Sequence, residues 1–211
     1  MGLFSSKEES FLGIDIGAHG IKLVELRKAK GRPQVWTYGV VERQLDIHAD
    51  SVQDLGDLLE QSTGVRPKGY GKKNKNAGFD QEKRIDEYAS LLKELVKQTK
   101  AKTLRATSSL PVSQVFHTVI NFPKLERKQV DGIVKAEVAK LLPHPVDQMQ
   151  IVHQPVPMSE RDSKRFTRLL VTAAPKQLVA FYTSIFRKAG LQLQELETEA
   201  FALARSLVGK D

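Results

Sequence analysis

The sequence predicts an α/β protein (α+β in the wider sense) built from two units. Residues 11–41 contain three short apolar segments separated by turn residues, which is typical of a strand meander, and helical periodicity begins only later. A second series of strands and helices starts near residue 112, after a strand that a proline ends. The chain has 211 residues, of which 40% are hydrophobic, so two units can each bury a core.

The first unit opens with strands and then changes to a helical pattern. The expected strands of the meander cover residues 11–16, 21–27 and 34–41. Gly17–Gly20 and Lys30–Pro33 separate them, and both segments carry turn chemistry. A short helix is expected near residues 52–59. Apolar residues then recur at helical spacing over residues 80–97, and residues 103–110 form a further strand.

The second unit is expected to have the order strand, helix, strand, strand, helix. In chain order these elements cover residues 115–122, 125–142, 149–156, 166–173 and 175–189. Pro143 and Pro145 end the first of these helices, and Gly190 ends the second. A strand over residues 191–197 follows, and Thr198 is expected to cap a last helix.

The charge of the chain is concentrated in one segment. The net charge is +8, and residues 66–84 alone hold seven Lys or Arg against two acids. Glycines and asparagines interrupt that stretch, which predicts a flexible basic loop over residues 64–84. The alternative is a surface for anionic partners. Only Tyr70 and Phe79 could stack on bases there, so no specific nucleic acid is expected.

The composition limits the chemistry further. The chain has no cysteine, which excludes disulfides and thiolate chemistry, and no apolar run approaches the roughly 20 residues of a membrane span. The five histidines show no metal spacing, and we see no nucleophile–base or acid–base arrangement. From the residues alone, the sequence therefore offers no catalytic arrangement.

The most informative segment is Gly13–Lys22. It places Asp15 near the end of a buried strand, a turn between two glycines, and Lys22 on the next strand. A phosphate can approach such a hairpin because glycine lets backbone N–H groups come close, and lysine supplies a point charge. The candidate cofactor-binding residues are Asp15, Gly17, Ala18, His19, Gly20 and Lys22. Asp15 is also the candidate residue for Mg²⁺, through water, once a nucleotide is bound.

This hairpin resembles the first phosphate loop of the actin–hexokinase–Hsp70 superfamily. The wider segments Phe11–Gly17 and Ile21–Leu26 are similar to the N-terminal half of the PilM family of type IV pilus assembly proteins, which belongs to that superfamily. Further similar segments follow in the family's order: Ser109–Pro111, Ala136–Asp147, Leu170–Lys176, Gly190–Leu191 and Glu197–Leu203. The resemblance extends over nearly the whole chain.

The resemblance implies half of an actin-like (ribonuclease H-like) nucleotide fold. Residues 1–111 would form the first part of the actin-like subdomain. Residues 112–190 would be an inserted β-α-β-β-α subdomain, as in PilM and the division protein FtsA. Residues 191–211 would return to the actin-like part.

The resemblance also implies a function. PilM is a cytoplasmic adaptor at the inner membrane, held there through its partner. It binds the N-terminal tail of the inner-membrane protein PilN, in a groove between core and inserted subdomain, and couples that platform to the pilus motor. Self-association is a further expectation. The alternatives are a fragment of an actin-superfamily kinase or ATPase, an FtsA-like division protein, and a homologue from a type II secretion system or another pilus system.

Two departures bear on the cofactor. Many family members have hydroxyl residues in the loop, where this chain has Ala18, His19 and Gly20. The family also has a second half with another phosphate loop and the adenosine site, beyond the segments matched here. ATP with Mg²⁺ is therefore expected to bind weakly, if at all.

Overall fold

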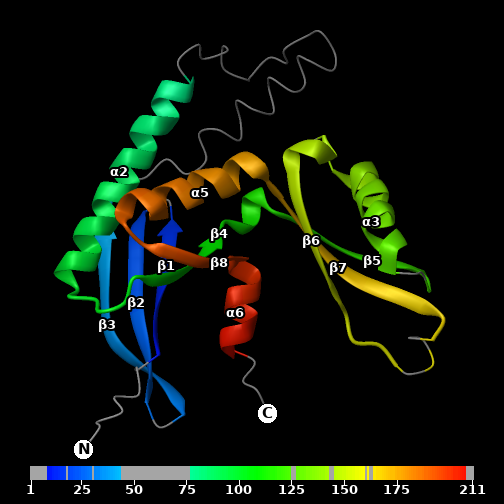
Figure 1. The fold of residues 1–211 in the computed structure, drawn as a ribbon, viewed down its shortest axis with the longest axis horizontal. Coiled ribbons are helices and arrows are strands. Elements are labelled where there is room, and N and C mark those ends of the chain that lie inside the picture. The colour runs from blue at the N-terminus through cyan, green and yellow to red at the C-terminus, as the bar shows by residue number, and fades with distance from the viewer. Residues whose placement is uncertain are drawn as a thin grey trace, which may run out of the picture. The chain divides into compact units, whose positions relative to one another are not determined.

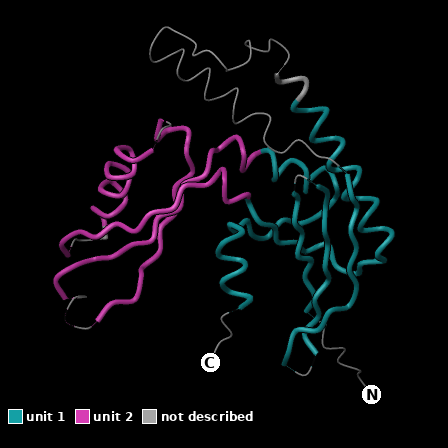
Figure 2. The backbone as a smooth tube through the Cα atoms, turned by 180° about the vertical axis from the view of Figure 1, so that it is seen from behind, with its two compact units in different colours: residues 1–110, 181–211 teal, residues 111–180 magenta. Residues whose placement is uncertain are grey.

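The structure, a computed structural model, describes residues 9–17, 19–29, 31–43, 77–124, 127–142, 145–159, 161 and 164–207. The chain forms two compact units (Figure 2). The first contains Met1–Leu110 and Phe181–Asp211, and the second is the continuous segment Pro111–Ala180. In the described ranges, no helix is long and apolar enough to cross a membrane.

The first unit contains a five-stranded sheet with the order β3-β2-β1-β4-β8 (Figure 1). Its strands are β1 (Ser10–Gly17), β2 (Gly20–Ala29), β3 (Arg32–Glu42), β4 (Arg105–Leu110) and β8 (Gln192–Thr198). The first three pair antiparallel and form the predicted meander, whereas β4 pairs parallel with both β1 and β8. Parallel neighbours need a crossover connection outside the sheet.

Helices α2 (Ala77–Gln98) and α5 (Lys176–Ala189) pack on one face of this sheet. The rings of Tyr88 in α2 and Phe181 in α5 meet edge to face, with centroids 5.6 Å apart. Alternate residues of a strand share a face, so β1 and β2 present an apolar side to these helices. The buried side chains of this core include Leu12, Ile14, Ile16, Ile21, Leu23, Leu92, Ile185 and Phe186.

A buried carboxylate joins β2 to the segment between α2 and β4. Glu25 is fully shielded from solvent. Its carboxylate accepts hydrogen bonds from the backbone N–H of Lys102, at 2.8 Å, and from Nε of Arg27, at 3.2 Å. A buried charge is tolerated only when it is paired and hydrogen-bonded in this way.

The opposite face of the five-stranded sheet is covered less completely. Helix α6 (Glu199–Leu207) packs beside β4 and β8, and none of its residues is buried. Apolar side chains on β2 and β3 remain exposed, with Tyr38 at 75%. We call this surface, made of Leu26, Val35, Tyr38 and Val40, the open face.

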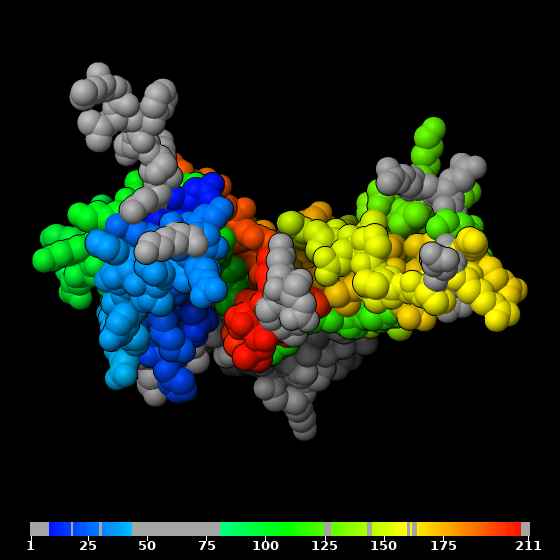
Figure 3. Space-filling model, turned by 90° about the horizontal axis from the view of Figure 1, so that it is seen from below, coloured from blue at the N-terminus to red at the C-terminus, as the bar shows by residue number. Residues whose placement is uncertain are grey.

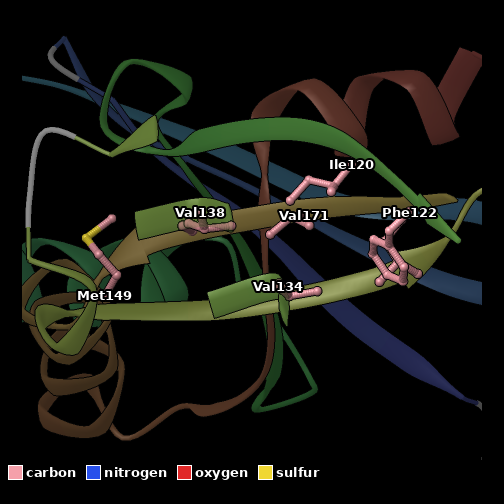
Figure 4. Close-up of a cluster of buried hydrophobic side chains, with 8 residues drawn as sticks. Ile120, Phe122, Val134, Val138, Met149 and Val171 are labelled. Carbon is pink, nitrogen blue, oxygen red and sulfur yellow. The ribbon is translucent and has the colours of Figure 1, made fainter. Parts of the chain in front are cut away.

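The second unit is a smaller antiparallel sheet with one helix. Strands β5 (Phe116–Pro123), β6 (Met149–Pro155) and β7 (Phe166–Pro175) have the order β5-β7-β6, and α3 (Arg127–Leu141) packs on one face. Two 3-10 turns, η1 (Val112–Gln114) and η2 (Val146–Gln148), follow prolines. The core cluster in Figure 4 consists of Ile120, Phe122, Val134, Val138, Met149, Leu169, Val171 and Ala173.

The division of the chain differs from the predicted one at α5. The sequence assigned this helix to an inserted unit of residues 112–190, but the second unit ends at Ala180. Tyr182 is buried, and its hydroxyl donates a hydrogen bond of 3.4 Å to the carbonyl of Ile16 in β1. Periodicity predicts that a helix has an apolar face but does not tell which sheet that face covers. The parallel pairing of β4 and β8 requires a crossover helix, and α5 is that helix.

Two smaller predictions also need correction. The basic loop predicted over residues 64–84 overlaps α2, so Lys83 and Arg84 are helical, and Arg84 lies over the ring of Phe181. The first turns of α2 carry charged residues, as the solvent face of a helix does, and the sequence pattern there was therefore assigned to the loop. Residues 64–76, and the short helix expected near 52–59, lie outside the described residues. The hydroxyl of Thr198 finds no hydrogen-bond partner among the described residues, so it does not cap α6.

Candidate functional site

The candidate site is the tight hairpin between β1 and β2. Gly17 and Gly20 face each other across the two strands, which leaves a two-residue turn. Gly20 has φ +140°, and a Cβ there would lie 2.0 Å from the carbonyl oxygen of Val41. Only glycine fits this position, because a side chain would be strained by the backbone angle and would collide with β3.

Asp15 and Lys22 are brought together as the sequence predicted. The register sets them directly opposite each other on β1 and β2, and Lys22 Nζ lies 3.2 Å from Asp15 Oδ2. The side chains are 39% and 67% exposed, respectively. An ion pair this open to water contributes little to stability, so both groups remain available to a ligand.

Of the other predicted site residues, His19 lies in the turn itself. It is exposed, and its carbonyl accepts a hydrogen bond of 3.1 Å from the backbone N–H of Arg43. Ala18 lies outside the described residues. Together with Gly20 and Lys22, His19 borders a shallow hollow of about 390 Å³.

A larger cavity, of about 620 Å³, lies next to the hairpin on the partly covered face of the sheet. Figure 3 shows α6 in red beside the blue strands β1–β3, with a hollow between them. The floor of the cavity is formed by strand residues such as Gly13, Tyr38 and Val40. Its charged side chains are Asp15, Lys22, Glu195, Glu197 and Arg205.

Sequence reasoning missed part of this charged wall. Arg205 of α6 forms an ion pair with Glu197 at the end of β8. Neither Glu197 nor Arg205 is among the site residues predicted from the sequence. The hint was the segment Glu197–Leu203, which resembles the family. No local pattern showed that the parallel pairing of β4 and β8 would set Glu197 near the hairpin.

The charged side chains of the larger cavity suit a nucleotide phosphate only when a divalent cation accompanies it. The wall holds three carboxylates against two cations, and each cation is already paired with a carboxylate. This arrangement disfavours a bare phosphate. A complex with a divalent cation fits better, because Mg²⁺ is usually held by one or two carboxylates together with the phosphates and water. Asp15 and Glu197 would be those carboxylates, and such a complex would supply phosphate charge to the hairpin.

A buried tyrosine supports the hairpin from the other side of the sheet. Burial, with a further contribution from the charge of Asp15, raises the pKa of the Tyr182 hydroxyl far above its ordinary value. The group therefore stays protonated and keeps donating to Ile16, two residues from the turn. This hydrogen bond links α5 to the strand that carries Asp15.

The sheet order, the crossover helices and the glycine hairpin together define half of an actin-like fold. A family profile described as type IV pilus assembly protein PilM matches residues 45–209, which is more than half of the chain. The chain belongs to the family of the type IV pilus assembly protein PilM. The hairpin residues 15–22 precede the matched segment.

Solved structures agree with the fold. A structure titled "PilM-PilN type IV pilus biogenesis complex" matches with TM-score 0.67 and 22% identity, covering 93% of this chain and 49% of that one. The cytoplasmic domain of EpsL, an inner-membrane component of the type II secretion system of Vibrio cholerae, matches with TM-score 0.53 and 9% identity, covering 90% of this chain and 57% of that one. The chain thus spans about half the length of these proteins.

Proposed function

We propose that this chain is an adaptor in type IV pilus assembly that binds the N-terminal tail of a PilN-type inner-membrane protein. The observation that carries the proposal is the PilM family match over residues 45–209. The likeness in fold to a PilM–PilN complex, along 93% of this chain, supports it. On this proposal the chain works in the cytoplasm, at the inner membrane through its partner, and couples that membrane platform to the pilus motor.

The proposal includes the absence of catalysis. Lys22 pairs with Asp15 in the cavity, and Arg205 pairs with Glu197. We assign none of the charged side chains of the cavity the role of a base or nucleophile. The competing hypothesis, a fragment of a kinase or ATPase of the same superfamily, predicts release or transfer of phosphate from ATP. Phosphate release above that of a heat-denatured sample would count against the adaptor.

The direct test is a fluorescence-anisotropy titration of the whole chain against a labelled peptide that copies the N-terminal tail of its PilN-type protein. We expect saturable binding in the micromolar range or tighter, about −8 kcal/mol or better. A scrambled peptide is the control. Equal binding of both peptides, or of neither, would contradict the proposal.

Two matched variants locate the bound peptide. Val40 on the open face of the first unit and Val119 on β5 of the second unit are exposed to a similar degree, 55% and 50%. Val40→Lys and Val119→Lys each place a charge on an apolar surface without disturbing a core. The variant that weakens peptide binding identifies the sheet that the tail contacts, and the other serves as its control.

A further inference from the structure

We propose that one end of the second unit binds the surface of an anionic lipid bilayer. The proposal does not rest on the adaptor function, because it starts from where the charge of this unit lies. Residues 111–180 hold ten Lys or Arg against six Asp or Glu, and the segments 124–128 and 160–168 alone hold seven of these cations and three of these acids. The rest of the unit is neutral, so the two short segments account for its whole net charge of +4.

The fold brings these two segments together where β5 ends and β7 begins (Figure 1). Pro123 lies opposite Phe166 in the register of the two strands, and the backbone N–H of Lys124 donates a hydrogen bond of 2.9 Å to the carbonyl of Arg165. Helix α3 begins at Arg127, shortly after Lys124, so its first turn lies at the same end of the unit. We call this end the basic tip, and its described cations are Lys124, Lys128, Arg161, Lys164, Arg165 and Arg168.

Several cations of the basic tip are not neutralised by the protein. Lys128, Lys164 and Arg165 are exposed, and none of them forms an ion pair with a carboxylate of the residues that the structure describes. By contrast, Lys140 at the other end of α3 pairs with Glu137 at 2.6 Å. The positive charge of the basic tip is therefore available to an anion from outside the chain.

An apolar ring among these cations favours a lipid surface over other anions. Phe166 at the start of β7 is 43% exposed, and the guanidinium of Arg165 lies 5.9 Å from the centre of its ring. Surfaces that bind bilayers combine Lys or Arg, which contact the headgroups, with apolar side chains that enter the boundary of the acyl chains. A single-stranded nucleic acid stacks its bases on several aromatic rings, and Phe166 is the one aromatic residue of the two segments.

The test is co-sedimentation of the whole chain with sucrose-loaded vesicles. Vesicles of phosphatidylglycerol and phosphatidylcholine are anionic, and vesicles of phosphatidylcholine alone are the neutral control. We expect saturable binding to the anionic vesicles only, and its loss in about 1 M NaCl, where the Debye length is about 3 Å. The vesicles contain no protein, so the result is independent of the peptide titration that tests the adaptor.

A triple variant removes three positive charges from the basic tip: Lys128→Gln, Lys164→Gln and Arg165→Gln. A cation near an anionic bilayer strengthens binding by about fivefold, so we expect the triple variant to bind anionic vesicles at least tenfold more weakly. Phe166→Ala should weaken binding by about threefold, because less apolar surface enters the bilayer. Circular dichroism checks that each variant is folded.

The matched control removes the same charge from the first unit. Lys83, Lys93 and Lys97 are exposed on α2, and no ion pair engages them among the described residues. Replacing all three by Gln should leave the affinity for anionic vesicles within about threefold of that of the unaltered chain, since binding falls off within a Debye length of the contact surface.

Three results would overturn the proposal. The first is no binding of the unaltered chain to anionic vesicles at low salt, or equal binding to neutral vesicles. The second is a triple variant of the basic tip that binds anionic vesicles as tightly as the α2 control does. The third is a DNA oligonucleotide that binds the unaltered chain more tightly than the vesicles do and loses this affinity in the triple variant, which would assign the basic tip to nucleic acid.

Discussion

The two units build their cores in different ways. In the first unit the largest fully buried side chains are aromatic, Tyr88, Tyr182 and Phe186, and all come from the helices α2 and α5. In the second unit the largest fully buried side chains among the described residues are the valines Val134, Val138 and Val171. The first unit also assembles residues far apart in the chain, since Tyr182 and Ile16 are 166 positions apart, whereas the second is the continuous segment Pro111–Ala180.

This difference teaches where each unit should be vulnerable. The core of the first unit needs α5, which lies at the end of the second unit's segment in the chain. That core therefore depends on contacts between residues far apart in sequence. The second unit contains all of its own strands and its helix. Contacts that are distant in sequence form late and cost more loop entropy. We therefore expect the two units to respond separately to damage in their cores.

Phe186→Ala is the variant with the largest expected effect, and it tests whether the first unit can unfold while the second stays folded. Phe186 is fully buried in α5, so its truncation should cost about 3–5 kcal/mol of the free energy of unfolding, which is a large part of a typical domain's stability. Hydrogen exchange measured by mass spectrometry should show loss of protection in β1 and β2. Protection in β7 should persist, and an equal loss in both sheets would show that the units unfold together.

A second test addresses the buried carboxylate. Glu25→Ala removes the acceptor of the Lys102 N–H and one acceptor of the Arg27 guanidinium. We expect the first unit to lose about 2–3 kcal/mol, since Arg27 can still reach water. Urea denaturation gives the value. Glu137→Ala, which removes an exposed pair, should cost less than about 1 kcal/mol; similar losses for both would contradict the role given to Glu25.

The second unit can be weakened on its own with Val138→Ala. Removing two methyl groups from this fully buried site in α3 should cost about 2 kcal/mol. The loss of protection from hydrogen exchange should be confined to β5, β6 and β7. Ala136→Ser, at an exposed position of the same helix, is the control and should have little effect. Loss of protection in β1 would mean that the first unit depends on the second.

The smallest expected effect is a pH dependence of the second unit. Burial lowers the pKa of His117 in β5 below its ordinary value of 6.5. The unfolded chain therefore binds the proton more readily, so stability is complete above pH 6.5 and falls as the pH drops below it. Thermal unfolding followed between pH 7 and pH 5 measures this. His117→Gln should remove this part of the pH dependence, and an unchanged slope would contradict the assignment.

The hairpin could be predicted from the sequence because its information is local. Asp15 and Lys22 are separated by a turn flanked by two glycines, and a two-residue turn fixes the register that sets them opposite each other. The meander and the strand–helix alternation followed from periodicity for the same reason.

The rest depended on contacts that no local pattern records. Arg205 enters the cavity only because β8 pairs parallel with β4, and α5 joins the first unit only because that pairing needs a crossover. Both facts concern which elements become neighbours. Periodicity gives an element its apolar face and leaves the partner of that face undetermined, which is why the boundary of the second unit was predicted too far along the chain.

The edge strand of the five-stranded sheet, β3, carries a side chain whose fluorescence can be followed. The chain has one tryptophan, Trp36 in β3, which is 56% exposed and has the guanidinium of Arg27 stacked 3.6 Å from its ring centre. Tryptophan emission from the whole protein therefore comes from a single indole that lies against a charged side chain. An event that moves Arg27 or covers β3 will shift the wavelength of that emission, and an event confined to the second unit will leave the emission unchanged.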